Sequence, residues 1–111
     1  MSDRGFAAQL AEDLSPQDLR HVLAVFRTDV ERLTGTLTQA LQAADEARFR
    51  RAAHGLAGAA GAVGADDLEQ ACRRAMTGAH PMPGAMLEID ASAQVALGDL
   101  AAFINRLDAA T

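Results

Sequence analysis

The longest regular feature of the chain is a run of apolar residues at steps of three and four between residues 16 and 43. This spacing puts its members on one side of an α-helix. Ser15 is expected to cap the helix, Pro16 to take its first position, and acidic Asp18 to lie in its first turn. Gly35 does not interrupt the pattern. The apolar positions are Leu19, Val22, Leu23, Phe26, Val30, Leu33, Leu37 and Leu41.

Two shorter amphipathic segments follow, over 46–63 and 66–77. Asp45 can cap the first, and Gly64 supplies the left-handed residue that often ends a helix. Asp66 followed by Glu69 resembles a capping box at the start of the second. The expected inward residues are Phe49, Ala53, Leu56, Ala60 and Val63 in the first segment and Leu68, Ala71, Cys72, Ala75 and Met76 in the second.

The two ends of the chain complete the pattern. Residues 3–13 predict a short, weak helix with Phe6, Leu10 and Leu14 on one side. The stretch from Gly78 to Gly84, with prolines at 81 and 83, predicts a loop. A last helix is expected over 86–108. Its apolar stripe is Ile89, Ala93, Leu97, Leu100, Ile104 and Leu107.

These segments predict an all-α fold: an antiparallel up-down four-helix bundle with a short extra N-terminal helix. The length of 111 residues fits a single domain spanning 1–111. The 26 alanines support helices, because alanine loses no side-chain entropy in a helix. The composition therefore argues against an all-β architecture.

Composition narrows the functional classes. The net charge of −5 argues against general nucleic-acid binding, which needs a basic surface. No stretch approaches the roughly 18 apolar residues of a membrane helix, and the N-terminus has no secretory signal. The single Cys72 cannot form an internal disulfide. We expect a cytoplasmic protein, and the Met1 start favours a free-standing chain over an excised domain.

The residues with candidate chemistry lie opposite the inward stripe of the segment 46–63. Arg50, His54, Ala57, Gly58 and Gly61 are spaced so that they share the outward side of the helix. An imidazole is thus expected on the solvent side, with Arg50 and Arg51 one turn before it. Beyond it the surface would be nearly bare backbone.

The glycines beside this histidine are costly in a helix. Each costs about 1 kcal/mol relative to alanine, so Gly55, Gly58 and Gly61 together cost on the order of 3 kcal/mol. Two interpretations are open. The small residues allow another protein's surface to reach His54, or they allow a neighbouring helix of the same chain to pack closely. Intramolecular packing is favoured at Gly55, and the two interpretations are even at Gly58.

After His54 the chain reads Gly55-Leu56-Ala57-Gly58-Ala59-Ala60-Gly61-Ala62-Val63-Gly64-Ala65, with Leu68 and Cys72 in the next helix. This resembles the signature of histidine phosphotransfer (HPt) domains. That signature runs H-x-L-K-G-small-small-x-x-aliphatic-G-small and is followed by a helix with a leucine. The central third of the chain matches it closely, and the flanking helix lengths agree with the family's bundle.

The resemblance implies a phosphocarrier of a multistep phosphorelay, not an enzyme in the strict sense. His54 would accept a phosphoryl group from an aspartyl phosphate on a receiver domain and pass it to another response regulator. A hybrid sensor histidine kinase is a further implied partner. Monomers that form transient complexes are expected. The chain would need no cofactor of its own, because the receiver supplies Mg²⁺.

The chain departs from the signature at one position. The family usually has lysine where this chain has Ala57. We hypothesise that Arg50 or Arg51 supplies the missing positive charge. Ala57, Gly58 and Gly61 would form the face on which a receiver docks.

Other candidate sites are weaker. His21 is expected at the surface and His80 in the proline-containing loop, and Asp18 with His21 is too little for a bundle metal site. No metal is therefore expected. Without any lysine or glycine-rich phosphate loop, the chain has no ATP site of its own. Two alternatives to the phosphocarrier remain: an HPt-like protein that binds or sequesters a receiver without efficient transfer, and a purely structural bundle.

Overall fold

The computed structural model describes residues 14–78 and 81–110, and the first two helices start at the expected caps. Helix α2 spans Pro16–Gln42, and the Ser15 hydroxyl accepts a hydrogen bond from the Asp18 backbone N–H at 3.1 Å. Helix α3 spans Glu46–Val63, with the Asp45 carboxylate accepting from the Arg48 N–H at 3.1 Å. Gly64 ends α3 in the left-handed region, at φ 74°. The predicted helix over 3–13 lies outside the described residues.

Helix α4 spans Asp66–Thr77, as expected, but the predicted capping box is wrong. Ala65 is the N-cap, and no side chain accepts a hydrogen bond there. Glu69 instead pairs with Arg73 one turn later. The start of α4 is still stabilised by three acidic residues in its first turn, because their negative charges face the positive end of the helix dipole. These residues are Asp66, Asp67 and Glu69.

Helix α5 spans Met82–Ala110 and begins earlier than the sequence predicts. Pro83 and Gly84 lie in its first turn, where we expected a loop. The first-turn N–H groups of a helix have no intrahelical acceptor, so a proline there breaks no hydrogen bond. The Ala85 N–H already donates to the Pro81 carbonyl at 3.0 Å.

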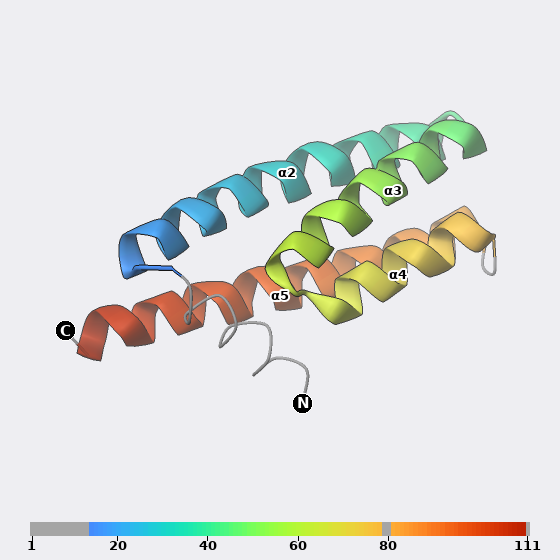
Figure 1. The fold of residues 1–111 in the computed structure, drawn as a ribbon. Helices are drawn as coiled ribbons and strands as arrows, with labels where there is room; N and C mark the ends of the chain where they lie inside the picture. The colour runs from blue at the N-terminus through green and yellow to red at the C-terminus, as the bar shows by residue number, and fades with distance from the viewer. Residues whose placement is uncertain (1–13, 79–80, 111) are drawn as a thin grey trace.

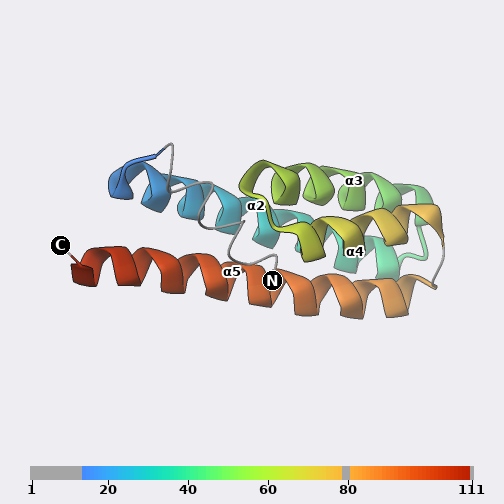
Figure 2. The ribbon, with the colours of Figure 1, turned by 60° about the horizontal axis from the view of Figure 1, so that its bottom comes forward.

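The four helices form the expected all-α bundle (Figure 1). Helix α3 packs against α2 and α4, and α5 packs against the same two helices, so α3 and α5 lie diagonally across the bundle (Figure 2). Helices α2 and α5 are longer than α3 and α4 and continue together beyond them. Arg20 of α2 pairs with Asp108 of α5 in this extension. Within the described residues, no helix combines the length and apolarity needed to cross a membrane.

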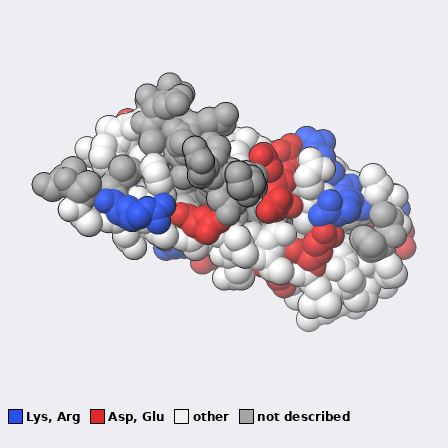
Figure 3. All heavy atoms as spheres, turned by 90° about the horizontal axis from the view of Figure 1, so that it is seen from below, with Lys and Arg blue, Asp and Glu red and all other residues white. Residues whose placement is uncertain are grey.

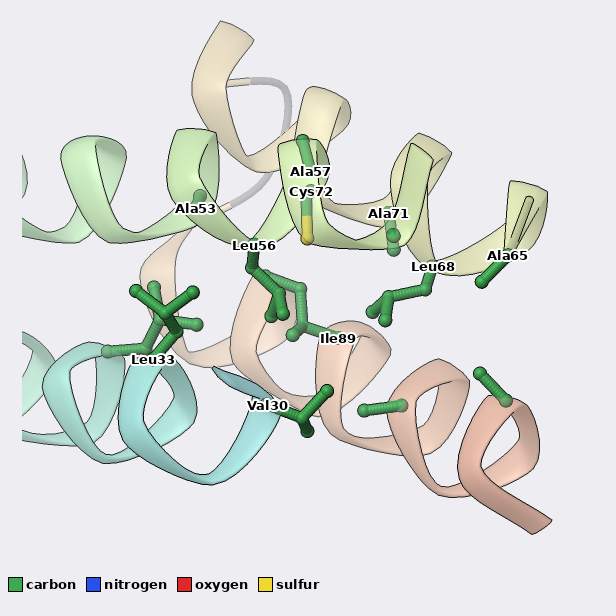
Figure 4. Close-up of a cluster of buried hydrophobic side chains, with 14 of the residues drawn as sticks. Val30, Leu33, Ala53, Leu56, Ala57, Ala65, Leu68, Ala71, Cys72 and Ile89 are labelled. Carbon is green, nitrogen blue, oxygen red and sulfur yellow. The ribbon is translucent and has the colours of Figure 1, made fainter. Parts of the chain in front are cut away.

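One apolar core joins all four helices. Leu56 and Leu68 point into the centre of the bundle, close to Ile89 (Figure 4). The predicted inward residues of α3 are all buried. In α2, Val22, Leu23 and Leu41 lie at the edge of the core instead of inside it. The largest fully buried side chains are Phe26, Phe49, Leu19, Leu37, Leu56, Leu68, Ile89, Leu100 and Cys72.

Candidate functional site

His54 lies in the middle of α3 with its side chain exposed to solvent, as the sequence predicts. Its position follows from the core of the same helix. Ala53 and Leu56 on either side are fully buried, so the rotation of α3 is fixed and residue 54 must face outward. An outward imidazole on a packed helix is accessible and yet held on a rigid backbone.

The three glycines beside His54 are in different surroundings. A Cβ on Gly55 would lie 3.4 Å from a Leu33 methyl group, which is an ordinary van der Waals contact with α2. A Cβ on Gly58 would have nothing within 4 Å. Position 55 therefore contacts a neighbouring helix, whereas position 58, where the sequence left both interpretations open, does not.

Gly61 is exposed, and a side chain from α4 lies over it. A Cβ on Gly61 would lie 3.4–3.5 Å from the carboxyl group of Glu69. Glu69 itself accepts hydrogen bonds from Arg73 at 2.6 and 3.2 Å. Position 61 therefore lies in contact with an acidic side chain of this same protein, unlike position 58.

The prediction that Ala57 is part of the exposed docking face is wrong. Its exposed fraction is only 4 %, because it lies on the side of α3 against which α4 packs. It belongs to the same buried cluster as Cys72 of α4 (Figure 4). The sequence pattern placed position 57 at the border between the two faces, and the position of α4 decides on which side it falls.

The two arginines before His54 differ in their partners. Arg50 pairs with Glu46 at 3.7 Å, and its guanidinium lies 3.7 Å from where a Cβ on Gly78 would be, at the far end of α4. Arg51 is exposed and forms no hydrogen bond or ion pair with any residue that the structure describes. Of the two, Arg51 is the one whose charge is not engaged by any residue in 14–78 or 81–110.

A hollow of about 400 Å³ lies beside the outward face of α3. It runs between the first half of α2 and the second half of α3. Val25, which is 48 % exposed, is part of its wall and lies off the predicted apolar stripe of α2. An exposed apolar residue off the helical stripe is the sequence signal that points to this hollow. The hollow is lined by Leu14, His21, Val22, Val25, Phe26, Asp29, Ala59, Ala62 and Val63.

The other polar groups that the structure describes form neither a metal site nor a reactive thiol. Within residues 14–78 and 81–110, no three His, Cys, Asp or Glu side chains are grouped to hold a metal ion. Burial, together with the nearby carboxylates of Glu69 and Glu88, raises the pKa of the Cys72 thiol to about 12. A thiol with so high a pKa is a poor nucleophile. On the face shown in Figure 3, acidic and basic side chains lie next to one another.

Comparison with known families finds a match that covers most of the chain. The family described as the Hpt domain matches residues 21–110, which covers most of the chain and all of α3 and α4. Comparison with curated proteins and with solved structures gives no match.

Proposed function

The chain belongs to the Hpt domain family, and from this membership we propose that His54 is the residue that receives and hands on the phosphoryl group. Hpt domains are phosphocarriers of phosphorelays and interact with receiver domains. The chain is accordingly a histidine phosphotransfer module of phosphorelay signal transduction. The identity of the carrier residue and the way the receiver approaches it are our proposal.

The observation that carries the proposal is that His54 and Gly58 share the exposed side of α3. The two lie one turn apart on the exposed side of α3, and no other part of the described structure comes near Gly58. Glycine at this position makes the helix about 1 kcal/mol less stable than alanine would. An approaching receiver explains the cost, because a surface without side chains lets its phosphorylated aspartate reach the imidazole.

The transfer itself exchanges one bond to phosphorus for another. A neutral nitrogen of the His54 ring attacks the phosphorus of the receiver's aspartyl phosphate. The new N–P bond forms as the bond from phosphorus to the aspartate oxygen breaks, and the carboxylate leaves with the electron pair. Transfer to a second receiver is the reverse reaction. Such chemistry depends mainly on in-line positioning and on charge stabilisation.

We assign the charge stabilisation to both partners. The receiver contributes its own carboxylates and Mg²⁺, and this chain needs no cofactor. On the side of this chain, Arg51 lies one turn from His54 and has no competing partner among the described residues. It is the better candidate than Arg50 to contact the phosphoryl oxygens, because Arg50 would have to leave Glu46.

The test is transfer from a receiver domain phosphorylated with acetyl phosphate in the presence of Mg²⁺. We expect an acid-labile, base-stable phosphoryl label on the wild-type chain and none on His54→Gln. Label on both proteins would contradict the assignment of His54. Binding of the receiver without any label would favour the alternative that the chain sequesters receivers, to which the absence of lysine at position 57 lends support.

The partners of the exchange are proposed in general terms. They are response-regulator receivers and a hybrid sensor kinase that carries one. The chain is proposed to act in the cytoplasm as a monomer that meets them transiently, since a carrier must leave one receiver before it can reach the next.

A further inference from the structure

The pair formed by Glu69 and Arg73 lies on the same side of the molecule as His54. The Glu69 carboxyl group rests over Gly61 of α3, and Gly61 lies seven residues after His54 on the same helix side. Seven residues of helix correspond to about 10.5 Å. Arg73 is bonded to that carboxyl group, so its guanidinium is placed near the same rim.

The register of α3 against α4 supports this placement. Gly61 lies opposite Glu69, and Arg50 reaches Gly78, so the two helices run in opposite directions. Between these two contacts, Arg73 falls beside the turn of α3 that contains Ala57. That turn follows His54 directly along α3.

Within this ion pair, Arg73 is the partner that is exposed to solvent. The Arg73 side chain is 56 % exposed, whereas that of Glu69 is 22 % exposed. The guanidinium has five N–H donors, and the bonds to Glu69 use its Nε–H and one N–H of Nη2. Three donors therefore remain for another partner, while the carboxylate that orients the arginine is largely shielded.

Arg74, the next residue, provides a contrast. It pairs with Glu88 of α5 and is 45 % exposed. Its hydrogen bond to that carboxylate raises the pKa of its guanidinium. Its partner lies on α5, whereas Arg73 pairs with a residue of its own helix that contacts α3. The two neighbouring arginines thus carry the same charge and make similar ion pairs, but they point about 100° apart around α4.

We propose that Arg73 contacts the receiver and helps to determine which receivers exchange phosphoryl groups with His54. The inference rests on the proposed function. A transient interface buries roughly 600 Å² on each partner, which as a round patch has a radius of roughly 14 Å. Centred on His54, such a patch includes the rim where Arg73 lies. The group that would pair with the guanidinium is a carboxylate beside the receiver's phosphorylated aspartate, where carboxylates are needed to bind Mg²⁺.

The test compares Arg73→Ala with Arg74→Ala, which removes the same charge and also one ion pair. The donor is the receiver domain that labels the wild-type chain fastest in a panel phosphorylated with acetyl phosphate. For Arg73→Ala we expect kcat/KM to fall by about fivefold or more at low ionic strength, mainly through KM. The loss should shrink as salt is added, because charges at a rim are screened. Arg73→Lys should recover most of the rate, and Arg74→Ala should transfer like the wild type.

A second donor separates docking from chemistry. Phosphoramidate is small and labels histidine without a protein partner, by losing ammonia as the new N–P bond forms. Arg73→Ala should react with it at the wild-type rate. Equal rates for the two alanine variants with the receiver would overturn the inference, as would a slower reaction of Arg73→Ala with phosphoramidate. Failure of the wild-type chain to take label from either donor would instead overturn the proposed function.

Discussion

Replacing Gly58 by alanine should separate the stability of the fold from its function. The added methyl group would meet nothing within 4 Å in the free protein, so it would cause no steric clash in the fold. Alanine is favoured over glycine inside a helix by about 1 kcal/mol. The Gly58→Ala variant should therefore be more stable than the wild type, with a thermal midpoint about 4–8 °C higher.

The same methyl group should impair phosphotransfer. If a receiver packs directly on the backbone at Gly58, an added methyl group overfills that contact. Overpacking of this kind costs about 1–3 kcal/mol, which corresponds to roughly a 5–150-fold lower kcat/KM. The assay is transfer from a phosphorylated receiver, followed beside a thermal melt of each protein. A small donor such as phosphoramidate should label the variant normally, because it does not need the docking surface.

Gly98→Ala is the matched control. Gly98 lies within α5, diagonally across the bundle from α3, and a Cβ there would also have nothing within 4 Å. This variant should gain the same stability and transfer like the wild type. Wild-type transfer by Gly58→Ala would refute the reasoning, since the receiver would then not use the open backbone. A lower midpoint for Gly58→Ala would refute the premise that the fold leaves this position empty.

Three further changes test other parts of the structure. Arg51→Ala should slow transfer from the receiver at least threefold more than Arg50→Ala, because Arg50 is engaged by Glu46. Equal transfer rates for the two variants, measured in a quenched time course, would argue against this assignment. Asp45→Ala removes the cap of α3 and should lower the free energy of unfolding in urea by about 1 kcal/mol. Cys72 has a folded-state pKa of about 12 against an ordinary value of 9.0, so folded stability should fall as pH rises above 9, by up to about 1.4 kcal/mol per pH unit. A Cys72→Ala variant measured in urea over the same pH range should lack this part of the slope, and an identical slope would contradict the assignment.

Most of the helical framework can be predicted from local signals. Ser15, Asp45 and Gly64 each act at a helix end through their own side chain or backbone, so their roles depend little on distant parts of the chain. The sequence predicts too late a start for α5, because proline breaks a helix at most positions. Its effect depends on its position within the helix, and in the first turn it is tolerated.

The borders of the site are harder to predict, because they depend on how helices pack. Ala57 lies at the edge of the outward face in the helical pattern, and only the packing of α4 buries it. Gly58 and Gly61 look alike in the sequence, yet one faces open space and the other faces Glu69. The position of His54 could be predicted because both of its neighbours in the core stripe are strongly apolar.

The central claim, that His54 carries the phosphoryl group, is tested most directly by locating that group after exchange with a phosphorylated receiver. Mass spectrometry of the chain, digested under alkaline conditions that preserve phosphohistidine, should place the added phosphoryl group on the peptide containing His54. The His54→Gln protein should carry none, while it should fold and bind the same receiver as the wild type does. A phosphoryl group on His21 or His80, or one that persists in the His54→Gln protein, would contradict the claim.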